Sequence, residues 1–286
     1  MRAGDDIVQE NQRLQRELGQ LRARVRALES SRWWRMHPRF LLRRLHLQET
    51  TTSAAAADGA HDLPIDFDDT DAELCRSVGP YTMTTPPRIY ALARAVEYVV
   101  SRQVPGAFVE CGVWRGGSMM AVALTLLRLG VTDRELYLFD TFSGMTPPGQ
   151  EDVKHTGERA SDLLAGSSHD SHDWAVASLE EAQEAVLSVG YPEAHIHFVQ
   201  GAVEDTLPAK APTQIALLRL DTDWYASTKH TLVHLYPRLS RNGVVIIDDY
   251  AYWQGARKAV DEYIQENNLL LLLNRIDYTA RIAVKP

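Results

Sequence analysis

The sequence predicts an α/β fold, a doubly wound and mostly parallel sheet of seven strands with an antiparallel edge strand. Apolar runs of strand length, rich in β-branched residues, alternate with helix-length segments along the chain. Glycines directly follow the first of these runs, and carboxylates follow several others. The expected strands span residues 107–111, 135–140, 196–200, 215–220, 244–247, 269–273 and 281–284.

The composition indicates an acidic body with a basic appendage. The chain has 286 residues, 45% of them apolar, which is enough for one large domain and an additional segment. Its net charge of -8 argues against nucleic acid as a partner. Residues 1–48 carry 11 arginines against 5 acids, a net +6, so the remainder carries -14. We therefore expect a basic arm at residues 1–48, a linker at 49–64 and the main domain at 65–286.

The arm has a heptad pattern of apolar residues. This pattern predicts a short parallel coiled coil, and hence a homodimer or higher homo-oligomer, because a lone Asn at an a position can select strand number. The alternative is a single amphipathic helix that folds onto its own domain. The a positions hold Asn11, Leu18 and Val25, and the d positions hold Ile7, Leu14, Leu21 and Leu28.

Arginines and bulky apolar residues interleave over residues 32–45. This composition suits peripheral contact with an anionic membrane or another protein, and a helix packed on the body fits it equally well. The chain lacks an apolar run long enough to span a membrane, and its start does not resemble a signal peptide. The two cysteines, Cys75 and Cys111, imply no disulfide framework. The expectation is a cytoplasmic location, with membrane-peripheral attachment through the arm as the alternative.

The loop after the first strand has the features of a cofactor site. Gly112 lets the backbone turn tightly beside a ligand, and Ser118 could cap the following helix, expected at about 119–129. The GxGxxG dinucleotide pattern is absent, and the acidic Glu110 precedes the glycine. This arrangement favours S-adenosylmethionine over a nicotinamide cofactor.

Residues after the second and third strands extend this cofactor site. Asp140 ends the second strand at the distance where Rossmann-like domains place a ribose-binding carboxylate, although it could instead cap a helix. Gly201 and Val203 follow the third strand, where this architecture frames an adenine.

Four carboxylates follow the next two strands. Asp221 and Asp223 come after residues 215–220, and Asp248 and Asp249 come after residues 244–247. The carboxyl ends of neighbouring parallel strands meet at one edge of the sheet, where clustered carboxylates repel each other unless a hard cation such as Mg²⁺ lies among them. A metal-dependent enzyme is the prediction.

A polar segment at residues 147–174 interrupts the α/β pattern. It contains three histidines and nearby acids that could suggest zinc, but their spacing fits no closed site. A mobile lid over the cofactor edge is the preferred interpretation.

Four motifs together resemble the macrocin O-methyltransferase family. They are VECGVWRGGS at 109–118, FDTFSGM at 139–145, LRLDTDWYAST at 218–228 and IIDDY at 246–250. The resemblance covers about residues 80–286 and leaves the first 48 residues outside. It implies a Rossmann-like class I methyltransferase fold and metal- and S-adenosylmethionine-dependent methylation of sugar hydroxyls in macrolide and aminocoumarin antibiotics.

The resemblance also implies roles for individual residues. Asp223 matches the family's proposed general base, and the acceptor would be a sugar-bearing small molecule or glycan. A catechol-type methyltransferase and a non-catalytic scaffold that recruits glycan-modifying partners through the arm are the alternatives. The implied ligands of Mg²⁺, or of another divalent cation, are Asp221, Asp248 and Asp249; the implied cofactor cradle is Glu110, Gly112, Ser118, Asp140 and Thr141, with Thr82 and Met83 closing over it.

Overall fold

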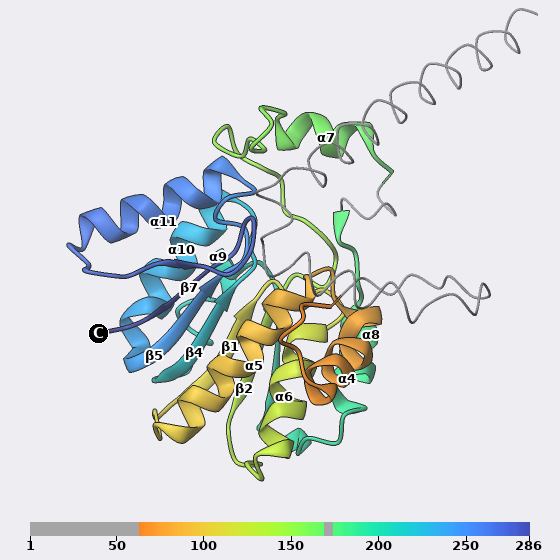
Figure 1. Ribbon diagram of the computed structural model, residues 1–286. Helices are drawn as coiled ribbons and strands as arrows, with labels where there is room; N and C mark the ends of the chain where they lie inside the picture. The colour runs from red at the N-terminus through yellow and green to blue at the C-terminus, as the bar shows by residue number, and fades with distance from the viewer. Residues whose placement is uncertain (1–62, 169–173) are drawn as a thin grey trace, which may run out of the picture. The chain divides into compact units, whose positions relative to one another are not determined.

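The computed structural model describes residues 63–168 and 174–286 (Figure 1). The expected coiled coil, the rest of the arm and most of the linker lie outside the described residues. Among the residues described, no helix is both long and apolar enough to cross a membrane.

The described chain is built on one seven-stranded sheet with the order β3-β2-β1-β4-β5-β7-β6. The first five strands in this order are parallel, and β7 is antiparallel to both β5 and β6. The predicted sheet is thus confirmed, with two antiparallel pairings at its edge. The strands are β1 Ala107–Cys111, β2 Leu136–Asp140, β3 Ile196–Gln200, β4 Ile215–Leu220, β5 Leu239–Ile247, β6 Asn274–Arg275 and β7 Arg281–Val284.

Helices cover both faces of the sheet, which explains why the central strands are apolar on both sides. Val244 and Ile246 of β5 belong to one hydrophobic cluster, and Val245 and Ile247 belong to another. The first cluster includes α4 Asp69–Val78, α5 Pro86–Ser101, α6 Gly117–Arg128 and α8 Leu179–Leu187; the second includes α9 Val203–Thr206, α10 Tyr225–Leu235 and α11 Gln254–Glu266 (Figure 1).

Local sequence signals start several of these helices. Asp68 caps α4 and exchanges side-chain hydrogen bonds with Asp71, so the acidic stretch at 65–73 starts a helix. Ser178 and Glu181 form the same box at the start of α8. Ser118, in contrast, does not cap α6. The N-cap is Gly116, without a side-chain hydrogen bond, and Ser118 is buried within the first turn.

The predicted strand at residues 269–273 is wrong. The edge strand β6 contains only Asn274–Arg275, and the five leucines before it lie outside any strand. Leu270 and Leu272 are 92% and 77% exposed, whereas the alternate leucines pack partly against the second cluster. Packing of alternate leucines therefore anchors this segment, without the backbone hydrogen bonds to a neighbouring strand that define a β-strand.

The segment expected to be a lid contains α7 Ala160–Gly166. Its first part is bonded to the start of α11 and to the loop before it: the Gln254 amide donates to the Val153 carbonyl at 2.8 Å, and the His155 amide donates to the Tyr252 carbonyl at 2.8 Å. Residues 169–173 of this segment lie outside the described part of the chain.

Candidate active site

The carboxyl ends of the central strands converge on one cavity of about 630 Å³. The ladder of backbone hydrogen bonds continues one residue past the strands. The Gly112 amide donates to Phe139 at 2.9 Å, the Asp221 amide to Cys111 at 2.8 Å, and the Asp248 amide to Leu220 at 2.9 Å. Sheet geometry thereby places the glycine loop and the acidic residues around the same cavity.

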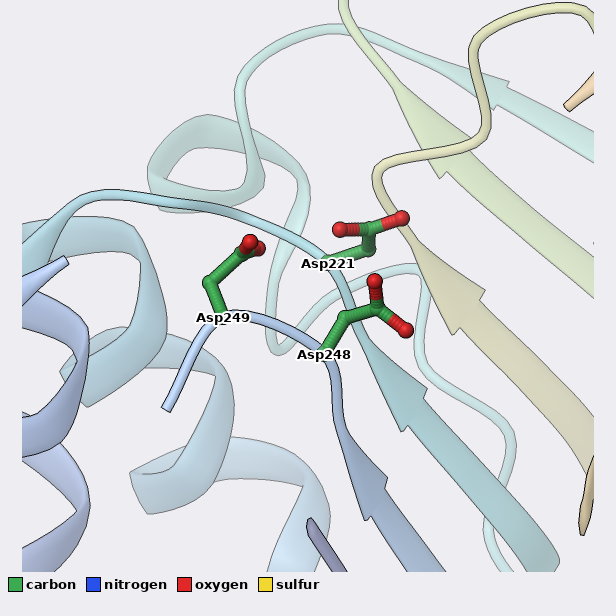
Figure 2. A group of neighbouring side chains, drawn as sticks. All are labelled: Asp221, Asp248 and Asp249. Atoms are coloured by element: carbon green, nitrogen blue, oxygen red, sulfur yellow. The ribbon is translucent and has the colours of Figure 1, made fainter. Parts of the chain in front are cut away.

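Three carboxylates lie together at the ends of β4 and β5 (Figure 2). One oxygen each of Asp221, Asp248 and Asp249 lies within 4.8 Å of the others. The Oδ2 atom of Asp249 is buried and has no hydrogen-bond partner. Loss of solvent, together with the neighbouring carboxylates, raises the pKa of Asp249 well above its usual value. Such an oxygen-only donor set suits a hard divalent cation, which would relieve this repulsion.

Asp223 faces the same cavity from a strained turn. Its φ of 58° is left-handed, and the Trp224 amide donates to the Thr222 carbonyl across it at 2.6 Å. The indole N–H of Trp253 donates to Asp223 Oδ1 at 2.8 Å. Loss of solvent raises the pKa of Asp223 to about 8, and the charge of Asp221 adds to the increase.

A buried arginine of β4, Arg219, balances part of this negative charge. Its guanidinium contacts Glu110 at 2.5 Å, Asp221 at 2.9 Å and Asp248 at 2.7 Å. Burial alone would lower the pKa of Arg219, but the three carboxylates outweigh burial and raise it well above its usual value. We did not predict this role from sequence, although an arginine in an otherwise apolar strand was an available signal.

A second arginine reaches the acidic cluster from the start of α5. Arg88 forms ion pairs with Asp248 and, at 2.7 Å, with Asp277 in the turn between β6 and β7. Both carboxylate oxygens of Asp248 therefore contact arginines, while each oxygen keeps a second lone pair. No sequence signal distinguished Arg88 from other arginines at helix starts.

The cofactor half of the cavity is shaped mainly by backbone. Gly112 has φ 84°, and a Cβ there would lie 1.9 Å from the Asp221 carbonyl oxygen. Asp140 accepts hydrogen bonds from the amides of Val113 at 2.5 Å, Trp114 at 3.0 Å and Phe142 at 2.8 Å. Its carboxylate thus supports the glycine loop and also lines the cavity.

The structure brings most of the predicted cofactor residues to this cavity. Glu110 differs, because it is fully buried under the cavity wall, where one carboxylate oxygen pairs with Arg219. Burial, with the charges of Asp221 and Asp248, raises the pKa of Glu110 to about 8, although Arg219 opposes the shift. The predicted residues that line the cavity are Thr82, Met83, Gly112, Ser118, Asp140, Thr141, Gly201 and Val203.

An apolar wall closes the opposite side of the cavity. Trp224 and Trp253 meet edge to face with ring centroids 4.9 Å apart, and they form a third hydrophobic cluster with α7. Buried Asp152 anchors this wall, because its carboxylate accepts from the amides of Tyr225 at 2.7 Å and Gly149 at 2.6 Å. The expected lid segment therefore contributes Lys154, Ala160, Leu163 and Leu164 to the cavity lining.

Comparison with known proteins identifies the family. A family model described as Macrocin-O-methyltransferase (TylF) matches residues 25–284, so the similarity reaches farther toward the N-terminus than the motifs suggested. A demethyldecarbamoylnovobiocin O-methyltransferase of Streptomyces niveus is 34% identical over 183 residues, covering 64% of this chain and 67% of that protein. A rhamnosyl-tetracenomycin C 4'-O-methyltransferase of Streptomyces olivaceus is 35% identical over 199 residues, covering 70% and 73%.

Solved structures agree with this result. The O-methyltransferase NovP has a TM-score of 0.64 and 31% identity, covering 72% of this chain and 82% of that chain. The calicheamicin methyltransferase CalS11, with a TM-score of 0.52 and 18% identity, covers 82% and 99% and shares the fold. The chain belongs to the macrocin O-methyltransferase family and is an S-adenosylmethionine-dependent O-methyltransferase.

Proposed function

We propose that this chain transfers a methyl group from S-adenosylmethionine to a sugar hydroxyl of a glycosylated natural product or glycan, in a Mg²⁺-dependent reaction. The observation that carries the proposal is the convergence of three carboxylates on a cavity that the glycine loop also lines. Relatives named for a rhamnosyl-tetracenomycin and for mycinamicin III support a sugar acceptor.

We assign Asp221, Asp248 and Asp249 to the divalent cation. The donor set fits, because all three groups offer carboxylate oxygens and the Asp249 Oδ2 atom has no partner. Arg219 contacts one carboxylate oxygen of Asp248 and Arg88 contacts the other, and these two ion pairs fix the orientation of that side chain. When bound, the cation supplies positive charge for an oxygen that loses its proton, and S-adenosylmethionine supplies an electrophilic methyl group.

We assign the proton transfer to Asp223. An alcohol is too weak an acid to attack at neutral pH without a base, and a positioned carboxylate removes this barrier. Trp253 engages Oδ1 of Asp223, so Oδ2 is the atom that we expect to accept the proton. Gly112, Asp140, Gly201 and the other lining residues at the ends of β1 to β3 would hold the cofactor on the opposite side.

Methyl transfer to defined acceptors tests the proposal. Purified protein is incubated with methyl-labelled S-adenosylmethionine, MgCl₂ and one of three probes: demethyldecarbamoylnovobiocin, mycinamicin III or catechol. We expect transfer to a glycoside that EDTA abolishes and Mg²⁺ restores. Transfer to catechol alone would support the catechol alternative, which the aromatic wall by itself could accommodate. Cofactor binding without transfer to any glycoside would favour the scaffold alternative.

Substitution of the acids tests the individual roles. We expect Asp223→Asn to reduce kcat roughly a hundred- to ten-thousandfold, because the base is lost. Asp221→Ala should have a comparable effect through the metal. Both variants should bind S-adenosylhomocysteine normally in calorimetry. The matched control is Asp133→Asn. Asp133 is an exposed acid that precedes β2, so it lies at the amino end of the strands, whereas the cavity lies at their carboxyl ends. Normal turnover by Asp223→Asn would show that another group is the base.

A further inference from the structure

The hydrogen bond between Trp253 and Asp223 points to a role beyond packing. We propose that Trp253 is a positioning residue: its indole N–H holds Oδ1 of Asp223 so that Oδ2 faces the acceptor hydroxyl. The inference rests on the proposed function of Asp223 as general base. Trp253 contacts the proposed base at 2.8 Å, and both residues line the cavity.

The backbone of Asp223 is held in one conformation, so the direction of its carboxylate depends on the side-chain torsion angles. The three-residue turn from Thr222 to Trp224 holds Asp223 in left-handed geometry. The Ser227 hydroxyl donates to the Thr222 carbonyl at 2.9 Å and ties this turn to the start of α10. Only rotation about the side-chain bonds can then change where the carboxylate points.

Electrostatic repulsion acts on that rotation. Asp221, Asp248 and Asp249 line the same cavity as Asp223, and like charges at close range repel each other. The charged Arg219 guanidinium contacts Glu110, Asp221 and Asp248. Within the described part of the chain, the group that donates to Asp223 is instead the neutral indole of Trp253. A neutral donor holds the carboxylate in place without the strong ion pair that would weaken it as a base.

Trp253 is itself rigid. Its side chain is 8% exposed and rests edge to face on Trp224, whose own indole N–H donates to the Thr146 carbonyl at 2.8 Å. The Trp253 amide donates to the carbonyl of Asp249 at 3.2 Å. The loop after β5, which carries the proposed metal ligands Asp248 and Asp249, therefore also carries the group that orients the proposed base.

The two indoles provide a matched pair for a test, because each donates one hydrogen bond but only Trp253 bonds to Asp223. We expect Trp253→Phe to lower kcat about 10- to 100-fold, as for loss of a hydrogen bond to a charged group, with the acceptor KM changed less than about threefold. Trp224→Phe removes the bond to Thr146 instead and should lower kcat by a smaller factor. The acceptor is whichever glycoside probe gives the highest turnover.

An isosteric replacement separates the hydrogen bond from packing. Replacement of Trp253 by 3-benzothienylalanine keeps the fused rings and exchanges the N–H group for sulfur. We expect the same loss in kcat as in Trp253→Phe, with unchanged melting temperature and S-adenosylhomocysteine affinity. Wild-type kcat in this variant would overturn the inference, since the ring shape alone would then suffice.

The inference and the proposed function fail in different ways. Full turnover by Asp223→Asn would refute the base assignment, and the positioning role would fail with it. Loss of turnover in Asp223→Asn with wild-type kcat in the benzothienyl variant would refute only the role of Trp253. If neither glycoside probe is methylated, crystal structures of wild-type protein and Trp253→Phe with S-adenosylhomocysteine decide. An unchanged Asp223 carboxylate orientation would overturn the inference, and a reoriented carboxylate would support it.

Discussion

The two halves of the cavity are built by different means. Around the cofactor loop, shape comes from backbone: Gly112 leaves no space for a Cβ beside Asp221, and a Cβ on Gly117 would lie 2.6 Å from the backbone of Tyr81. Around the acids, shape comes from charge, because Arg219 holds three carboxylates at hydrogen-bond distance. Each half should therefore be sensitive to a different class of substitution: the first to added volume, and the second to removed charge.

Adding one methyl group to the cofactor half should have the largest effect on stability. Gly112→Ala forces a Cβ to within 1.9 Å of the Asp221 carbonyl oxygen at a left-handed φ. We expect a loss of more than about 4 kcal/mol in the free energy of unfolding, measured by urea denaturation, because the backbone must move. Any folded fraction should bind S-adenosylhomocysteine poorly.

Gly130→Ala is the matched control for this substitution. Gly130 is also left-handed, with φ 71°, but a Cβ there meets nothing within 4 Å. Its cost should be conformational strain alone, about 1 kcal/mol. Equal losses for the two variants would mean that close approach of backbone does not define the cofactor half.

Removing the central charge of the acidic half should have the next largest effect. Arg219→Met leaves buried Glu110 and Asp248 without this cation, and breaking such a network typically costs about 3–5 kcal/mol. Adding Glu110→Gln to this variant replaces a buried ionisable group that has lost its partner with a neutral one, and should restore part of the loss. Urea denaturation of both variants checks this expectation. A double variant less stable than Arg219→Met would show that charge balance is not what Arg219 provides.

Sequence reasoning anticipated the features that follow from strand order. Residues that directly follow parallel strands must meet at one edge of the sheet, so the positions of Gly112, Asp140, Asp221 and Asp248 followed from the pattern alone. The leucines at 269–273 misled the prediction because five consecutive apolar residues have the length and composition of a buried strand, and only the missing backbone partner distinguishes them.

The contacts that balance and orient the acids were not predictable in the same way. Arg88 and Asp248 are 160 positions apart, and Trp253 and Asp223 are 30 apart, so no local periodicity relates them. Their pairing depends on how α5 and the loop before α11 pack over the sheet. The roles assigned to Asp223 and the metal ligands came from family resemblance, because strand alternation does not separate a base from a ligand.

A substitution in the turn between β6 and β7 should have the smallest effect on stability. This turn carries Asp277, the acid at the outer limit of the acidic half of the cavity. Asp277 accepts from Arg88 Nε at 2.7 Å and from the amides of Thr279 at 3.0 Å and Ala280 at 2.9 Å. Burial opposes ionisation, but these donors lower the pKa of Asp277 to about 2. Asp277→Asn should therefore cost about 1–2 kcal/mol at neutral pH.

The pH dependence of this loss tests its electrostatic origin. The pKa of Asp277 is lower in the folded chain than the usual aspartate value of 3.8, so its stabilising contribution is complete above about pH 4 and disappears as the pH falls toward 2. The stability difference between wild type and Asp277→Asn, from urea denaturation, should be constant from about pH 7 to 5 and shrink at about pH 3.5. A stability difference that does not change with pH would mean that Asp277 acts through hydrogen-bond geometry alone. The ion-pair network of the acidic half would then extend only as far as Arg88.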